Sequence, residues 1–138
     1  MMSSHSQATR VVSWIAQLIA AAILLQTLYF KLTGAEESRF IFTTLGVEPW
    51  GRIGSAIVEF VAAVLLLSPR RAALGALVAC GVMVGAIGAH LTRLGIEVQA
   101  DGGLLFGLAC AVFSCSALVL WLRRAELPIV GQRLARIG

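Results

Sequence analysis

The stretch that decides the fold is PWGRIGSAIVEFVAAVLLL, residues 49–67. It is apolar over almost the length of a bilayer crossing and carries one carboxylate, Glu59, near its middle. We expect a membrane-spanning helix that begins at about Trp50, an aromatic residue favoured at the membrane surface. At about 1.5 Å per residue, Glu59 would lie roughly 13 Å below that surface. A charge at such depth costs about 2.5–3.5 kcal/mol on insertion scales, which makes Glu59 a candidate functional residue.

The composition of the whole chain also favours lipid as its solvent. Of the 138 residues, 59% are hydrophobic and only 13% are charged, and the mean hydropathy is +0.90. A soluble domain is nearer half apolar and a quarter charged. The formal charge of +4 comes from basic residues at the ends of apolar runs. That pattern is typical of membrane flanks, so we expect a lipid bilayer as partner and no nucleic acid.

Three further apolar runs predict three more spans. A cleaved signal peptide is the alternative for the first run, but its apolar part is too long and no small-residue cleavage site follows Tyr29-Phe30-Lys31. Short connections between the runs indicate an all-α fold, an integral membrane antiparallel four-helix bundle in a single domain over residues 1–138. The N-terminus is polar and the C-terminal tail is basic. The expected spans are residues 11–30, 50–67, 72–91 and 103–122.

The connections carry local signals of their own. Residues 38–45 are expected to form a short interfacial helix that ends at Gly46, and Ser68-Pro69-Arg70-Arg71 is expected to be a tight turn. Asp101 is a predicted N-cap for the last span. Glycines in the third span are expected to let neighbouring helix backbones approach closely. These glycines are Gly75, Gly81, Gly85 and Gly88.

The distribution of basic residues predicts the orientation of the chain. Seven lie on one side of the expected bundle and four on the other, and the richer side is normally cytoplasmic. Both termini are therefore expected in the cytoplasm, with the two longer loops facing outward. The seven are Arg10, Arg70, Arg71, Arg123, Arg124, Arg133 and Arg136, and the four are Lys31, Arg39, Arg52 and Arg93.

Helical spacing groups the small and polar residues of each span into one stripe, which we expect to face the other helices. Opposite faces hold residues such as Ile19, Leu65, Leu77 and Leu118, which suit lipid. The four stripes are Ser13, Gln17, Ala20, Leu24, Thr27 and Lys31; Arg52, Ser55, Glu59, Ala62 and Leu66; Ala76, Ala79, Met83, Ala86, His90 and Arg93; and Gly103, Gly107, Cys110, Ser114, Ala117 and Trp121.

These stripes predict a polar cluster in the outer half of the bundle, built on Lys31, Glu59 and His90. Arg52 or Arg93 is expected near its mouth, and Gln26 or Thr27 as an additional donor. For each basic residue a structural alternative exists: Lys31 can extend to the interface, and His90 can bond to a loop carbonyl. The Lys31–Glu59 pair can also simply fix the register of two helices.

Metal and dithiol chemistry are not expected. One inward histidine and one glutamate are too few ligands for a zinc site. The cysteines, Cys80, Cys110 and Cys115, fall inside apolar runs and form no C-x-x-C pair, which is typical of small apolar side chains in a core.

Five motifs stand out together along the chain: Phe30-Lys31-Leu32-Thr33-Gly34, residues 42–50 (FTTLGVEPW), Gly51-Arg52-Ile53-Gly54, Glu59, and residues 89–96 (AHLTRLGI). Over residues 12–124 this combination resembles the DoxX family of small four-helix membrane proteins. Lys31 and Glu59 match the family pattern best, and His90 with the residues after it resembles a subgroup. The resemblance implies a bacterial inner-membrane protein; some relatives are linked to quinone-dependent oxidation of sulfur compounds and others to oxidant-defence complexes.

Three functions compete at this stage, and whether the chain is an enzyme stays open. In the first, a redox-associated subunit binds quinone, with Lys31 or His90 on a quinone carbonyl and Glu59 as proton relay. In the second, the chain is a non-catalytic anchor for another membrane protein. In the third, it carries a small solute or protons, with a homo-oligomer forming the path. Quinone is the one cofactor considered, and a redox protein is the expected partner.

Overall fold

Every element of regular secondary structure is helical over the part that the structure, a computed structural model, describes, residues 4–127. The all-α class is confirmed for that part. The basic tail from residue 128 onward, with Arg133 and Arg136, lies outside the described residues. The elements are α1 (Ser4–Thr33), α2 (Glu36–Thr44), α3 (Trp50–Leu66), α4 (Ala72–Ala89), the π-helix η1 (His90–Leu94), α5 (Leu104–Leu122) and the 3₁₀ turn η2 (Arg124–Glu126).

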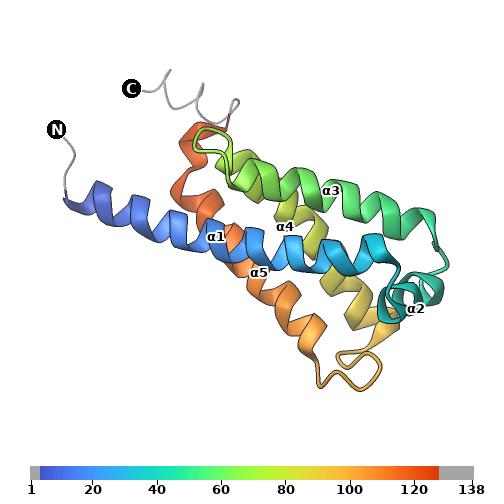
Figure 1. Cartoon of the computed structure of the whole chain (residues 1–138). Helices are drawn as coiled ribbons and strands as arrows, with labels where there is room; N and C mark the ends of the chain where they lie inside the picture. Colours follow the sequence, from blue (N-terminus) through green and yellow to red (C-terminus); the bar gives the residue numbers. More distant parts are fainter. Residues whose placement is uncertain (1–3, 128–138) are drawn as a thin grey trace.

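Four long helices pack as a ring. Helix α1 packs against α3 and α5, and α4 packs against the same two helices from the other side (Figure 1). The short helix α2 lies across the end of the ring where α1 finishes and α3 begins, and it contacts α1, α3 and η1. One end of the ring is therefore covered by a helix, and the other by the turns around residues 67–71 and η2.

Three of the helical segments are long and apolar enough to cross a membrane, namely Gln7–Thr33, Ala72–Leu94 and Leu104–Leu122. Helix α3 is not among them, because it has only 17 residues. At about 1.5 Å per residue it is about 26 Å long, a little short of a hydrocarbon core of about 30 Å. The structure thus provides three of the four predicted spans by this measure, and the fourth stays a prediction.

The predicted inward stripes hold for three helices. Gln17 and Leu24 of α1, and Glu59 and Leu66 of α3, are buried, as is Met83 of α4. Small alanines fill the space between them, so the core is built from close helix approach rather than from large side chains. The exception within these stripes is Arg93, which is exposed.

The predicted inward face of the last helix is wrong. Gly107, Ser114 and Trp121 are exposed. Because α5 is apolar almost all round, the few small and polar residues do not mark its inner side. Its buried face instead carries Ala109, Val112, Ser116 and Val119.

Close backbone approach is confirmed at only one of the four glycines. A Cβ on Gly75 would lie 2.6 Å from the backbone nitrogen of Leu66, so α4 can meet the end of α3 only with glycine there. A Cβ on Gly81, Gly85 or Gly88 would meet nothing within 4 Å. The expectation is wrong for these three, because they do not face a neighbouring helix in the chain.

The predicted features of the loops are largely present. Helix α2 begins two residues earlier than expected and ends at Thr44; the positive φ of 77° at Gly46 then lets Val47 donate back to the carbonyl of Phe42 at 2.9 Å. The N-cap of α5 is Gly103, not Asp101. The carboxylate of Asp101 nevertheless accepts the first-turn amide of Leu105 at 3.1 Å, so it satisfies one of the free N–H groups of the helix.

Candidate functional site

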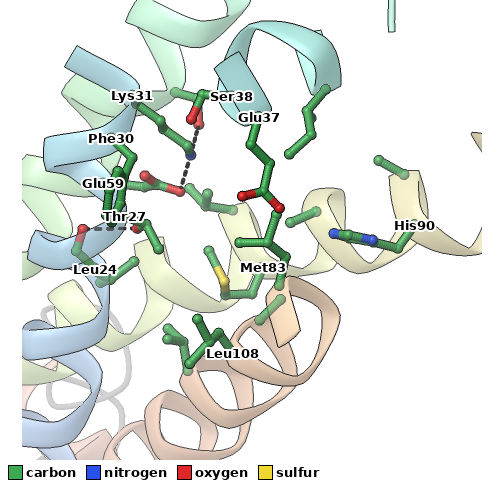
Figure 2. A pocket seen from close by; sticks show the side chains of 18 of the residues that line it. Leu24, Thr27, Phe30, Lys31, Glu37, Ser38, Glu59, Met83, His90 and Leu108 are labelled. Carbon is green, nitrogen blue, oxygen red and sulfur yellow. Dashed lines mark hydrogen bonds and ion pairs between the residues drawn. The ribbon is translucent and has the colours of Figure 1, made fainter. Parts of the chain in front are cut away.

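A pocket of about 510 Å³ lies inside the ring at the end that α2 covers (Figure 2). Its wall is mostly apolar, with side chains from α1, α4 and α5 such as Leu24, Met83 and Leu108. Pockets of this size and polarity hold small organic ligands, which a few polar groups orient. The polar side chains in the lining are Gln26, Thr27, Lys31, Glu37, Ser38, Ser55, Glu59 and His90.

An ion pair forms the polar side of the pocket. Lys31, in the last turn of α1, places its Nζ 2.6 Å from Oε1 of Glu59 on α3, and it also donates to the Ser55 hydroxyl at 2.8 Å. The exposed fractions are 16% for the Lys31 side chain and 3% for Glu59. Lys31 therefore turns inward to a buried carboxylate instead of extending to the interface, and Figure 2 shows this pair among the side chains that line the pocket.

The second oxygen of Glu59 has no hydrogen-bond partner within the described part of the chain. Oε2 is buried, and no donor from residues 4–127 reaches it. A buried acceptor without a hydrogen-bond donor destabilises the folded state by about 1–3 kcal/mol, and by more when it is charged. Such groups are rare in native proteins. Glu59 lines the pocket, so this unsatisfied oxygen belongs to a pocket-lining side chain.

His90 lies at the point where α4 changes to a π-helix, a local irregularity that is frequent at functional sites. Its ring is buried, packs edge-on against Phe106 with centroids 5.6 Å apart, and projects toward the pocket (Figure 2). Nδ1 lies 3.0 Å from the carbonyl oxygen of Gly95. The structural alternative for this residue is therefore present, since His90 bonds to a loop carbonyl. His90 also lines the pocket, and its role in binding a ligand stays a prediction.

Two side chains of α2 that the sequence analysis did not select also line the pocket, the carboxylate of Glu37 and the hydroxyl of Ser38. Glu37 points down from α2 toward the centre of the pocket, and Ser38 lies beside it (Figure 2). Burial, with the charge of Asp101 as a smaller cause, raises the pKa of Glu37 above its ordinary value. The pair Glu36-Glu37 in the sequence signals only the acidic start of a helix; which of the two faces inward follows from how α2 lies across the ring.

Of the other predicted site residues, some line the pocket and some do not, and none belongs to the Lys31–Glu59 ion pair. Thr27 and Gln26 line the pocket, and the Thr27 hydroxyl donates to the carbonyl of Leu24 at 3.0 Å. Arg52 does not line it: its Nε donates to Glu48 at 2.8 Å and its NH1 group to the carbonyl of Lys31. Arg93 is exposed and also outside the lining. Arg52 thus fixes the turn of α1 from which Lys31 projects.

Within residues 4–127 no group of three or more His, Cys, Asp or Glu side chains is placed to hold a metal ion. The cysteines at positions 80, 110 and 115 are free and half-buried. In the described part of the chain, the chemistry that the pocket can supply is hydrogen bonding, charge and proton exchange from the lysine, glutamates, histidine and hydroxyl groups.

Comparison with known proteins gave one match. A family model described as the DoxX-like family matches residues 15–117, which is well over half of the chain. The matched segment contains the ion pair, Ser55, His90 and α2. A search of curated proteins and a search of solved structures found no match.

Proposed function

The chain belongs to the DoxX-like family, as its motifs predict, and from this premise we propose that it is a quinone-binding, redox-associated membrane subunit. Family membership and the three apolar helices point to a membrane protein. The observation that carries the proposal further is the pocket. It combines an apolar wall with a buried lysine–glutamate pair at one side, which suits an apolar ring that carries polar oxygens.

The pair can both bind and exchange protons with such a ring. A lysine ammonium has three donors, of which two are used on Glu59 and Ser55, so one is left for a ligand oxygen. Glu59 lines the same pocket, and its buried Oε2 has no partner within residues 4–127. In the proposal, Lys31 orients the head group and Glu59 is the proton relay, since its buried carboxylate can pass a proton between the ring and the Lys31 side of the site.

The proposed setting is the inner membrane of a bacterium. All four long helices cross it, α3 included, with both termini in the cytoplasm and the pocket in the outer half. The arginines Arg10, Arg70, Arg71, Arg123 and Arg124 support this orientation. Reporter fusions that are active only in the cytoplasm or only in the periplasm, placed in the 45–49 turn and in the 67–71 turn at the two ends of α3, test it. The same signal from both positions would overturn the four-span topology.

A redox protein is the proposed partner of the subunit, because electrons that enter or leave a bound quinone need a donor or acceptor beyond the pair. A second copy of the chain is a further proposed contact, supported by the exposed glycine Gly81 on α4, which lies outside the pocket lining and permits close approach of another helix. Cross-linking in native membranes, followed by separation of homo-oligomers from larger complexes, distinguishes these two associations.

Binding of decylubiquinone to the purified full chain in lipid nanodiscs tests the proposed function. Ala86 lines the pocket, so Ala86→Phe fills part of it and is expected to weaken binding more than about tenfold. Ala22 is exposed on α1 and outside the lining, so Ala22→Phe is a matched control that should leave the affinity unchanged. Absence of binding to the native chain, or equal binding by the two variants, would contradict the proposal.

A further inference from the structure

We propose that the pocket prefers an occupant whose head group donates hydrogen bonds, and therefore holds the reduced, hydroxyl-bearing quinol more tightly than the oxidised quinone. This inference rests on the proposed function and specifies which form of the ligand the site favours. It follows from two acceptors on pocket-lining residues, Glu59 and His90, for which the described part of the chain supplies no donor.

The first unused group is Oε2 of Glu59. Oε1 already receives the Lys31 ammonium at 2.6 Å, whereas Oε2 is buried and receives nothing from the described residues. Only a donor can satisfy it, because an ionised carboxylate accepts hydrogen bonds and gives none. A quinol hydroxyl supplies that donor. A quinone has two carbonyl oxygens and no donor, so it leaves Oε2 unsatisfied.

The second unused group is on His90. The carbonyl of Gly95 can only accept, so the 3.0 Å contact requires the proton to be on Nδ1. In the neutral ring Nε2 then carries a lone pair and is an acceptor. His90, which lines the same pocket, is thus poised to receive a hydroxyl rather than to donate to a carbonyl.

The positive charge of Lys31 favours a neutral ligand donor over a cationic one. An ammonium group on the ligand would also satisfy Glu59 and His90, but it would lie beside the Lys31 ammonium, which is itself 2.6 Å from the glutamate. Like charges at such separation repel, and burial strengthens the repulsion. A neutral hydroxyl on an apolar ring avoids this conflict and can in addition accept the remaining Lys31 proton.

The expected size of the preference is roughly tenfold, the usual effect of one buried acceptor gaining its donor. A site that binds the reduced form tenfold more tightly raises the midpoint potential of the bound two-electron couple by about 30 mV. The affinity ratio and the shift in midpoint potential both measure the difference in binding between quinol and quinone.

The experiment measures the affinities of decylubiquinol, decylubiquinone and the dimethyl ether of decylubiquinol for the native full chain in nanodiscs under anaerobic conditions. The ether keeps the ring and tail but has no donor. We expect the quinol to bind roughly tenfold more tightly than the other two. Equal affinities for all three ligands would overturn the inference while leaving the proposed function intact, and no binding of any of them would overturn both.

Glu59→Gln assigns the preference to its residue. The amide keeps one oxygen for Lys31 and turns its NH₂ group toward the pocket, so the variant should lose the preference for quinol or reverse it. An unchanged preference would overturn the role of Oε2. Circular dichroism and thermal unfolding confirm that the variant is folded; if it is not, the three-ligand comparison on the native chain decides alone.

Discussion

Both ends of the helix ring bury polar side chains, but the hydrogen bonding of these side chains differs between the two ends. At the pocket end, Lys31, Ser55 and Glu59 meet beside a pocket of about 510 Å³, and one carboxylate oxygen keeps no partner within residues 4–127. The closed end is defined by Ser13, Gln17, Leu66 and Arg123. These groups form one continuous chain of hydrogen bonds.

At the closed end each bond leads to the next. Arg123 Nε donates to the Ser13 hydroxyl at 2.7 Å, that hydroxyl donates to Oε1 of Gln17 at 2.7 Å, and Gln17 Nε2 donates to the carbonyl of Leu66 at 2.6 Å. Next to this chain, Gly75 brings α4 against the backbone of Leu66. A continuous chain of hydrogen bonds and close packing hold the helices together at the closed end, although Ser13 and Arg123 also line a smaller, more open hollow of about 200 Å³. The buried Ser116 hydroxyl on α5 likewise has no partner within the described residues. What distinguishes the pocket end is an unsatisfied carboxylate oxygen on a side chain that lines a larger apolar pocket.

The largest expected effect comes from Lys31→Met. It leaves Glu59 as a buried charge without its cation, and breaking such a pair costs about 3–5 kcal/mol in a fully buried site. Because the Lys31 side chain is 16% exposed, we expect the lower value, about 3 kcal/mol in the free energy of unfolding. Unfolding by SDS in mixed micelles measures it.

The double variant Lys31→Met/Glu59→Leu is the control for that prediction. Removing both charges should restore most of the lost stability. Quinone binding should be lost in this variant, because neither polar group of the pair is left to orient the ring. If Lys31→Met alone unfolds like the native chain, the pair does not form as described and the distinction between the two ends fails.

Gln17→Leu breaks the closed end instead. The buried carbonyl of Leu66 loses its side-chain donor, so the free energy of unfolding should fall by about 2 kcal/mol. The affinity for decylubiquinone should not change, because Gln17 is not in the pocket lining. A loss of affinity equal to that of a pocket variant would show that the two ends are coupled.

Gly75→Ala and Gly81→Ala form a matched pair on one helix. The first places a Cβ 2.6 Å from the Leu66 nitrogen and should cost about 1–3 kcal/mol of stability. The second meets nothing within 4 Å and should be neutral or stabilising by up to about 1 kcal/mol. Thermal unfolding in detergent compares them; equal effects would contradict the close approach at the closed end.

The smallest effect concerns Asp101, beside the pocket end. Partial burial alone would raise the pKa of Asp101. Hydrogen bonds from the amides of Val98, Leu105 and Gly103, with the charge of His90 as a smaller cause, outweigh it and hold the pKa below its ordinary value. The stabilisation is therefore complete above about pH 3.8 and is lost as the pH falls through the lowered value.

Asp101→Ala should accordingly speed hydrogen exchange of those three amides relative to the native chain at the same pH. The difference between the two proteins should shrink once the pH drops below the lowered pKa of Asp101. A difference that stays constant through that range would show that the carboxylate charge does not order the loop.

Much of the arrangement can be predicted from the sequence because polar residues in an apolar helix are conspicuous. Gln17, Lys31, Glu59 and His90 stand out against methyl groups, and their helical spacing places them inward. Periodicity fails on α5, where apolar side chains lie on every side. The glycines of α4 are also misleading. A glycine allows another helix to pack closely, but its presence does not show that a helix packs there.

The remaining parts of the site depend on tertiary geometry. Glu37 enters the pocket because α2 lies across the end of the ring, and nothing in the local sequence separates it from Glu36. Arg52 bonds to Glu48 and to the carbonyl of Lys31 rather than facing the pocket. The position of the first turn of α3 beside these two groups determines this orientation. The free oxygen of Glu59 likewise follows from how many donors reach it, which spacing alone does not give.

A structure of the full chain with decylubiquinol bound in nanodiscs tests the central claim most directly. The account predicts ring density inside the pocket, with one hydroxyl oxygen within hydrogen-bond distance, about 2.7 Å, of Glu59 Oε2. Density for the ring on the outer, lipid-facing surface, with the Lys31–Glu59 pair untouched, would contradict it.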